Sequence, residues 1–229
     1  MPHPATPRKL PALPPAARCD TRAAAATCLS PAARALHRAI LHAFAETGRA
    51  PAPQELDRQA GTPLDTRAAL AELLAADAVV LDAGGAVVAA YPFSATRTLH
   101  RVEIRGGPTV FAMCAVDALG TSAMLGRPVT VTAREPDSDR QVRIEVDGGT
   151  AAFEPESAVV FAGTTGDWCC GPAATQRCGT INFFTTAQAA ESWAARHPEV
   201  TGQVLDQRQA LAWGVREFAG LLGRDGPSR

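Results

Sequence analysis

The first third of the chain shows apolar residues at helical spacing, separated by short breaks. Between residues 30 and 47, apolar side chains recur three and four positions apart, which predicts an amphipathic helix. They are Leu36, Ile40, Leu41 and Phe44. Ser30 is a candidate N-cap, Pro31 occupies the first helical position, and Gly48 lies just past the end.

Two more helical patterns and a hairpin follow this helix. Residues 52–61 predict a short helix, and residues 63–82 predict a longer one, with Asp65 as its N-cap, that runs into a strand. Gly84 and Gly85 turn that strand back into residues 86–93. Three helices followed by a two-stranded hairpin are typical of a winged helix. We therefore expect residues 30–95 to form a winged-helix-like module.

The rest of the chain mixes alternating strands with helices. Strand patterns occur at residues 97–105, 127–135, 141–149 and 157–165, and a further apolar strand follows at 177–184. Residues 186–198 predict a helix with Thr186 as its N-cap, and the chain ends in a strand or turn and a final helix. The expected fold class is α+β, in which residues 96–229 form a mixed, mainly antiparallel sheet domain with flanking helices.

Residues 1–29 are rich in proline, alanine and arginine. We expect a mobile tail that becomes helical around residues 21–28. Cys19 and Cys28 lie in this part. Incidental cysteines on a tail are favoured, and the alternative is that the two thiols capture or hand over a soft metal.

Composition narrows the class of protein. The chain has 229 residues, enough for one large domain or two small ones. Its net charge of −1 gives no indication of binding to nucleic acid or to an anionic membrane. The apolar runs are short and interrupted by charge, and prolines in the N-terminal stretch argue against a signal peptide. We expect a cytoplasmic protein whose thiols are reduced.

Winged helices often bind DNA, and the third helix of such a module is the one that would enter the major groove. It offers Arg67, but also Asp65, Glu72 and Asp77. A basic recognition face is missing. A structural or docking role for the module is therefore favoured, and no nucleic acid is expected as a partner.

The cysteines suggest thiolate chemistry. They are Cys19, Cys28, Cys114, Cys169, Cys170 and Cys178. No two form a Cys-x-x-Cys pair, so zinc-ribbon and thioredoxin-like sites lack support, and soft-metal binding or catalysis is favoured. The histidines are His3, His37, His42, His100 and His197. None has zinc-ligand spacing with a cysteine, and each is expected to be a surface or helix residue.

Cys114 and Asp117 form a candidate half-site. If residues 109–125 are helical, the two side chains share a face. A buried cysteine alone is more simply a small hydrophobic residue. Asp117, however, is the only charged residue between Phe111 and Gly126. Apolar surroundings raise the pKa of a carboxyl group, so Asp117 could hold a proton and act as a general acid. No local spacing pairs Cys114 with Cys178, and only the fold can bring them together.

Three segments resemble the organomercurial (alkylmercury) lyase family. FAMCAVDALGTSAMLGRPVTV, residues 111–131, resembles its signature, in which Cys-x-x-Asp begins an apolar helix. Residues 90–102 resemble the segment that joins the family's N-terminal module to its catalytic part. Residues 177–198 resemble its second active-site stretch. The similarity extends over about residues 30–220, and three motifs in the family's order make it specific.

The resemblance implies a mechanism. Cys114 matches the first catalytic cysteine, Asp117 the catalytic acid and Cys178 the second catalytic cysteine. Two thiolates would bind the mercury of R–Hg⁺, and the acid would protonate the carbon, which releases R–H and leaves Hg²⁺ on sulfur. No cofactor is implied, because mercury is substrate and product. The implied partners are an organomercurial, low-molecular-weight thiols and a mercuric reductase that accepts Hg²⁺.

The chain departs from the family pattern at three places and adds an adjacent cysteine pair. A structural cysteine that the family often has in the strands after the first motif has no match in residues 129–144. Met113 stands where many members have tryptophan, and Gly179 where some have cysteine. Cys169 and Cys170 precede the second motif and could handle product, with incidental loop thiols equally favoured. Two other functions stay open: a thiolate-based mercury or soft-metal binding protein, which would not need Asp117, and a metal-responsive regulator.

Overall fold

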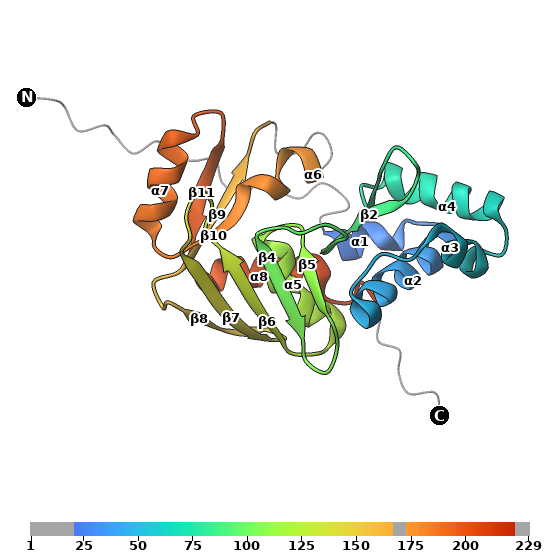
Figure 1. Ribbon diagram of the computed structural model, residues 1–229, viewed down its shortest axis with the longest axis horizontal. Helices are drawn as coiled ribbons and strands as arrows, with labels where there is room; N and C mark the ends of the chain where they lie inside the picture. The colour runs from blue at the N-terminus through green and yellow to red at the C-terminus, as the bar shows by residue number, and fades with distance from the viewer. Residues whose placement is uncertain (1–20, 167–172, 223–229) are drawn as a thin grey trace, which may run out of the picture.

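A computed structural model of the chain describes residues 21–166 and 173–222. Figure 1 shows a group of helices at one end of the molecule, a large sheet in the middle, and a small sheet with an outer helix at the other end. Helix α1 (Arg22–Thr27) lies beside the group of helices, and α5 (Ala115–Leu125) and α8 (Gln207–Phe218) lie behind the large sheet. The fold is α+β, and every strand pairing in the described residues is antiparallel.

The helices at one end follow the predicted order. They are α2 (Pro31–Thr47), α3 (Pro53–Ala60) and α4 (Pro63–Ala75), followed by the hairpin of β1 (Val79–Leu81) and β2 (Val87–Ala90). Helix α2 has the expected caps, because Ser30 accepts from the N–H of Ala33 and Gly48 ends the helix at φ 76°. The identification of this module as a winged helix stays a prediction.

The predicted N-cap of α4 is wrong. Thr62, not Asp65, precedes the helix in an extended conformation, and its hydroxyl oxygen accepts the N–H of Asp65. The Asp65 carboxylate in turn accepts from the Thr62 hydroxyl. Asp65 therefore lies in the first turn, where a carboxylate interacts favourably with the helix dipole.

Helix α1 (Arg22–Thr27) occupies part of the segment expected to be a mobile tail. Thr21 caps it, and Ala26 and Leu29 are buried in the main core. The backbone N–H of Arg22 donates to Glu217 near the C-terminus of the chain. The helix near residues 21–28 is thus confirmed, but these residues are packed rather than free. Residues 1–20 lie outside the described part.

The large sheet runs through both predicted parts of the chain. Its order is β1-β2-β3-β5-β4-β6-β7-β8. The additional strands are β3 (Phe93–Ser94), β4 (His100–Ile104), β5 (Thr109–Ala112), β6 (Val129–Arg134), β7 (Gln141–Asp147) and β8 (Thr150–Glu154). Strand β8 was not predicted. The sheet contains strands from both sides of residue 95 and does not mark a boundary there. The division into modules at 30–95 and 96–229 stays a prediction.

A second sheet forms the other end of the molecule. Its order is β10-β9-β11, from β9 (Val159–Thr164), β10 (Ile181–Phe184) and β11 (Thr201–Leu205). Helix α7 (Ala187–Arg196) covers it, with Thr186 as the predicted N-cap. Phe161, Phe184 and Trp193 form a separate small core there. The short helix α6 (Ala173–Gln176) and the 3-10 turn η1 (Cys178–Thr180) lead into β10.

Helices α5 (Ala115–Leu125) and α8 (Gln207–Phe218) pack against each other behind the large sheet. A Cβ atom added to Gly120 would lie 2.5 Å from the carbonyl oxygen of Gly214, and one added to Gly214 would lie 2.8 Å from the backbone nitrogen of Gly120. The two backbones therefore touch where neither residue has a side chain. Helix α5, between α8 and the large sheet, is almost completely buried. None of the described helices has the length and apolar character needed to span a membrane.

Candidate active site

Cys114 lies at the junction between β5 and α5. Residues 109–125 were expected to form one helix, and this prediction is wrong. They form a strand, a two-residue connection and a helix. Cys114 is extended, with φ −153°, and is the N-cap of α5. Its Sγ accepts a hydrogen bond of 3.4 Å from the backbone N–H of Asp117. The two side chains meet because a capping residue lies over the first turn of its helix, not because they share a helical face.

The fold brings Cys178 to this half-site. Cys178 begins the turn η1 immediately before β10, and β10 belongs to the second sheet. The Sγ atoms of Cys114 and Cys178 and a carboxylate oxygen of Asp117 all lie within 4.8 Å of one another. All three residues are buried, at 3 %, 6 % and 4 % exposure. Among the described residues, no other group of three acidic, cysteine or histidine side chains could hold a metal ion.

Burial changes the acidity of Asp117. Loss of hydration disfavours the charged carboxylate and raises the pKa of Asp117 from 3.8 to about 6. The positive charge of Arg22 and a hydrogen bond with Cys114 act in the opposite direction. The Oδ2 atom is buried without a hydrogen-bond partner in the described structure. Asp117 can therefore exchange a proton near neutral pH.

The Cys114 thiol is also shifted toward its protonated form. Burial raises the pKa of Cys114 well above its ordinary value, and hydrogen bonding with Cys178 and the negative charge of Asp117 add to this effect. The hydrogen bond from the Asp117 N–H lowers the pKa of Cys114. A base is thus needed to remove the thiol proton, and Asp117 is the carboxylate beside it.

Sequence patterns did not identify two neighbours of this site. The Arg22 guanidinium of α1 lies 3.4 Å from the ring centre of Tyr91, which follows β2. Burial and the negative charge of Cys178 both raise the pKa of Tyr91, and its hydroxyl has no hydrogen-bond partner in the described residues. Arg22 belonged to the expected tail, and no motif marked it. An arginine at the start of the alanine-rich stretch expected to be helical was the one available signal.

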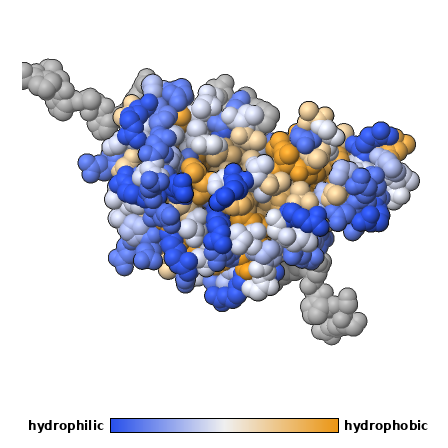
Figure 2. Space-filling model, in the orientation of Figure 1, coloured by the Kyte–Doolittle hydropathy of each residue, from blue (hydrophilic) through white to orange (hydrophobic). Residues whose placement is uncertain are grey.

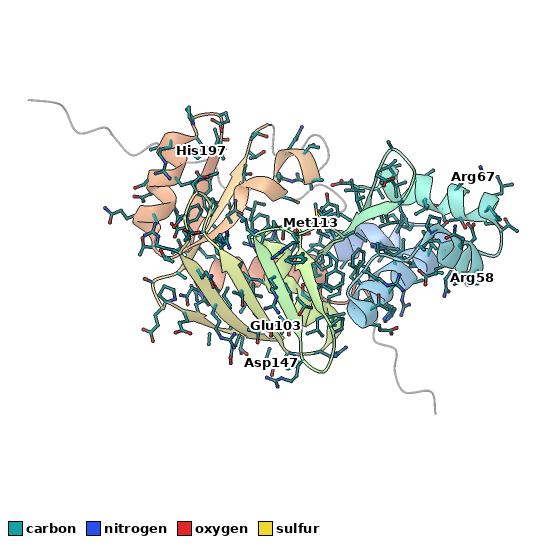
Figure 3. The ribbon with its side chains drawn as sticks, in the orientation of Figure 1. Arg58, Arg67, Glu103, Met113, Asp147 and His197 are labelled. Atoms are coloured by element: carbon teal, nitrogen blue, oxygen red, sulfur yellow. The ribbon has the colours of Figure 1, made fainter. Side chains whose placement is uncertain are left out.

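The positions that depart from the family pattern lie around the site. Met113 is half-buried at the end of β5, and Figure 3 shows it where the sheet meets the N-terminal helices. Gly179 is exposed in η1. Cys28 is exposed just after α1. The remaining candidates, Cys19, Cys169 and Cys170, lie outside the described residues.

The expectation that every histidine is a surface or helix residue is wrong for His100. His100 lies in β4 and is buried, with its Nε2 atom 3.2 Å from Oδ1 of Asn182. Burial lowers the pKa of His100 to about 4. The Asn182 amide donates to the carbonyl oxygen of Gly179. Through Asn182, strand β4 of the large sheet is thus linked to the turn that carries Cys178. The alternating pattern of β4 in the sequence could not show this link.

The surface near the site is more apolar than the ends of the molecule. Figure 2 shows hydrophobic residues gathered in the central part of this face, between the sheet and the N-terminal helices. The end around α7 is mostly hydrophilic. A small cavity of about 20 Å³ lies under α1, lined by Ala25, Ala26, Leu29 and Tyr91 among others. This volume is enough for about one water molecule.

Chemically, the arrangement offers two soft sulfur ligands and one proton-exchanging acid, all buried from solvent. Thiolate sulfur is a soft ligand and therefore prefers soft metal ions. The carboxyl is hydrogen-bonded with the Cys114 thiol and lies within 4.8 Å of both sulfur atoms, so it can exchange a proton with Cys114 or with a group bound between the two thiols. No histidine takes part in the three-residue group.

Known proteins with similar sequences and structures share one description. The family model for MerB, alkylmercury lyase, matches residues 93–219. The alkylmercury lyase of Staphylococcus epidermidis is 29 % identical over 194 residues, which cover 84 % of this chain and 85 % of that protein. The alkylmercury lyase of Streptomyces lividans is 33 % identical over 133 residues, or 57 % and 59 % of the two chains. A crystal structure of the mercury-bound form of MerB2 aligns with a TM-score of 0.71 at 25 % identity, over 87 % of this chain and 95 % of that one. The chain therefore belongs to the alkylmercury lyase family, whose members are enzymes that break carbon–mercury bonds.

Proposed function

We propose that Cys114, Cys178 and Asp117 carry out protonolysis of R–Hg⁺, the reaction in which a proton replaces mercury on carbon. The observation that supports it is the convergence of two thiols and one acid within 4.8 Å, all buried, from segments far apart in the chain. The net change is R–Hg⁺ plus two thiols giving R–H, Hg²⁺ bound by two thiolates, and one proton.

The first steps bind mercury to sulfur. Ionised Asp117 accepts the proton of the Cys114 thiol, whose pKa is raised by burial and by its neighbours. The Cys114 thiolate then forms a bond to mercury, because soft sulfur prefers a soft metal. The Cys178 thiol loses its proton to solvent and forms the second mercury–sulfur bond. Two sulfur donors increase the electron density on the carbon that is bound to mercury.

The last step breaks the carbon–mercury bond. Protonated Asp117 transfers its proton to the carbon, and the electron pair of the carbon–mercury bond forms the new carbon–hydrogen bond. R–H leaves, and Hg²⁺ stays between the two sulfur atoms. A pKa of about 6 suits Asp117 to both roles, since such a group accepts and donates protons near neutral pH. All electrons come from the broken bond, so these steps need no organic cofactor.

Release of Hg²⁺ requires a competing ligand in this scheme. Low-molecular-weight thiols, or a mercuric reductase that accepts Hg²⁺, would exchange with the two cysteines. Met113 borders the site in place of tryptophan, and we propose that it alters which organic groups are accepted. The domain division at residues 30–95 and 96–229 fits a site made by both parts, since Tyr91 interacts with Cys178 and Asp117 from the other side of residue 95.

The alternative is a thiolate-based mercury-binding protein on the same scaffold. Such a protein needs the two cysteines but gains nothing from an acid buried at 4 % exposure without a partner for Oδ2. Burial of an unpaired polar group costs free energy, so its presence favours catalysis. A DNA-binding regulator is less favoured, because α4 carries the acids Asp65 and Glu72 beside Arg67 and so offers no basic recognition face.

The test is a turnover assay with phenylmercury and excess thiol, in which benzene and inorganic mercury are measured over time. We expect repeated turnover by the wild type and by Asp147→Ala, which removes an exposed acid at the rim of the sheet. Asp117→Ala should still bind mercury but release no benzene. Stoichiometric mercury uptake without benzene from the wild type would establish a binding protein instead.

A further inference from the structure

Three groups converge on the carboxylate of Asp77, which follows α4. Its Oδ2 atom accepts a 3.1 Å hydrogen bond from the backbone N–H of Ala173. The same atom lies 3.6 Å from the guanidinium of Arg22 and 4.0 Å from that of Arg177. The Asp77 carbonyl oxygen also accepts a 2.6 Å hydrogen bond from Arg22. One residue of the N-terminal part thus joins α1, α4 and the segment that contains α6.

Two of these contacts lead directly to Cys178. Ala173 begins α6, and its carbonyl oxygen accepts the backbone N–H of Arg177. Arg177 immediately precedes Cys178 and is the N-cap of η1. The Asp77 carboxylate therefore contacts both the first residue of the α6 turn and the residue before the second cysteine.

The third contact leads to the other side of the site. The Arg22 guanidinium lies over Tyr91, and its positive charge acts on Asp117. The backbone N–H of Arg22 is held by Glu217 of α8. Asp77 thus fixes a cation that faces the catalytic acid and, through Ala173, the turn that bears the second thiol.

The backbone of Asp77 has an uncommon conformation. Its φ is 51°, in the left-handed region that residues other than glycine rarely adopt, although aspartate and asparagine tolerate it better than most. A residue persists in this conformation where its surroundings determine it, and such residues concentrate at functional sites. Glycine would satisfy this backbone more easily, so the backbone alone does not account for an aspartate here.

We propose that Asp77 is a positioning residue for the lyase reaction, which holds the Cys178 turn and Arg22 against the N-terminal helices so that the second sulfur stays within reach of Cys114. The inference rests on the proposed function of Cys114, Cys178 and Asp117. Misplacement of a reacting group by about 1 Å can lower a rate by about 100-fold. The turn needs such a restraint because Cys114 follows β5 of the large sheet, whereas Cys178 precedes β10 of the second sheet.

Two variants separate the side chain from the backbone. Asp77→Gly keeps the left-handed conformation but removes every contact of the carboxylate. We expect it to lower kcat with phenylmercury by about 10- to 100-fold, with a smaller effect on KM. Asp77→Asn keeps an oxygen for the Ala173 N–H and loses both ion pairs, so it should lose less activity than Asp77→Gly and stay about 3- to 10-fold below the wild type. Asp82→Asn, in the exposed β1–β2 turn, is the control and should be unchanged.

A second measurement reports position without turnover. Iodoacetamide labelling of Cys178, followed by peptide mass spectrometry, should be slow in the wild type and in Asp82→Asn because Cys178 is 6 % exposed. We expect labelling to become at least about 10-fold faster in Asp77→Gly. This readout also decides the inference if the wild type releases no benzene, in which case only the proposed function fails.

Three results would overturn the inference. One is a wild-type rate and slow Cys178 labelling in folded Asp77→Gly. A second is a loss of activity that follows thermal stability alone, with labelling unchanged. If Asp77→Gly does not fold, Asp77→Asn decides, and a rate and labelling equal to the wild type would count against the role.

Discussion

The backbone N–H of Asp117 donates a hydrogen bond to the Sγ of Cys114, so the first proposed mercury ligand is also the N-cap of the helix that carries the proposed acid. Four N–H groups at a helix start lack intrahelical partners, and a capping side chain satisfies one of them. The thiol thus has a structural role and a chemical role, and substitutions can separate the two.

Cys114→Ser should keep the fold and lose the reaction. Serine is among the preferred N-caps, and its oxygen can accept the same N–H. The free energy of unfolding should therefore change by less than about 1 kcal/mol, while benzene release from phenylmercury falls by at least about 1,000-fold, because a hydroxyl is a poor ligand for a soft metal. Urea unfolding measures the change in stability, and the turnover assay measures the loss of benzene release.

Cys114→Ala is the matched control for this variant. It loses the cap as well as the thiol, so it should be less stable than Cys114→Ser by about 0.5–2 kcal/mol and equally inactive. Cys178→Ser should also lose turnover, since only one mercury–sulfur bond remains. Substantial benzene release by any of these variants would refute the assignment of the thiol that it lacks.

Asp117→Asn should become relatively more stable as the pH rises. The pKa of Asp117 is raised to about 6 in the folded protein from 3.8, so the unfolded chain ionises first as the pH increases and the wild type loses stability over that interval. The variant lacks this loss. Its unfolding free energy relative to the wild type should therefore increase by roughly 2–3 kcal/mol between pH 4 and pH 8.

The measurement is chemical unfolding of both proteins across that pH range. Asp147→Asn, an exposed acid, serves as the control and should show no comparable trend. A difference between Asp117→Asn and the wild type that stays constant with pH would mean that Asp117 is not a buried acid with a raised pKa.

His37 should make the protein sensitive to acid. Burial lowers the pKa of His37 to about 4 from 6.5, and its Nε2 atom has no hydrogen-bond partner in the described residues. As the pH falls below 6.5, the unfolded chain binds a proton that the folded protein does not, and stability is lost. His37→Met should reduce the stability lost between pH 7 and pH 4.5 by roughly 2.5 kcal/mol.

His42→Met is the control for this experiment, because His42 lies in the same helix but is half-buried. Urea unfolding at the two pH values gives the comparison. Equal acid sensitivity of wild type and His37→Met would show that His37 is not kept neutral by its surroundings.

Gly120→Ala should destabilise the whole core. The new Cβ would lie 2.4 Å from the ring of Phe218 and 2.5 Å from the carbonyl oxygen of Gly214, so α5 and α8 would have to separate. Overpacking of this kind costs about 1–3 kcal/mol or more. Thermal unfolding should detect it, and turnover should fall because α5 carries Asp117.

Gly149→Ala is the matched control, because no atom lies within 4 Å of the added Cβ in the turn between β7 and β8. It should unfold at nearly the wild-type temperature. A Gly120→Ala variant as stable as this control would show that the helices can move apart without loss.

The sequence alone predicted most of the local structure. Helical spacing with Ser30 and Gly48 located α2, and alternation located β6, β7 and β9, because these signals depend on neighbours in the chain. Prediction from the sequence failed where one segment fits two local patterns. An apolar run from residue 109 suits a helix and a buried strand equally, and only the sheet decided that residues 109–112 pair with β3 and β4.

The candidate site was likewise predicted in part from the sequence and decided in part by the tertiary structure. Cys114 and Asp117 were identified from the sequence because an acid in an apolar segment is costly, and their resemblance to a family motif added Cys178. The convergence of Cys178 with them was decided by the tertiary structure, since it depends on contacts between two sheets. The same holds for Arg22 and Asp77. Their roles come from charges and hydrogen bonds between segments far apart in the chain, which no spacing along one segment can encode.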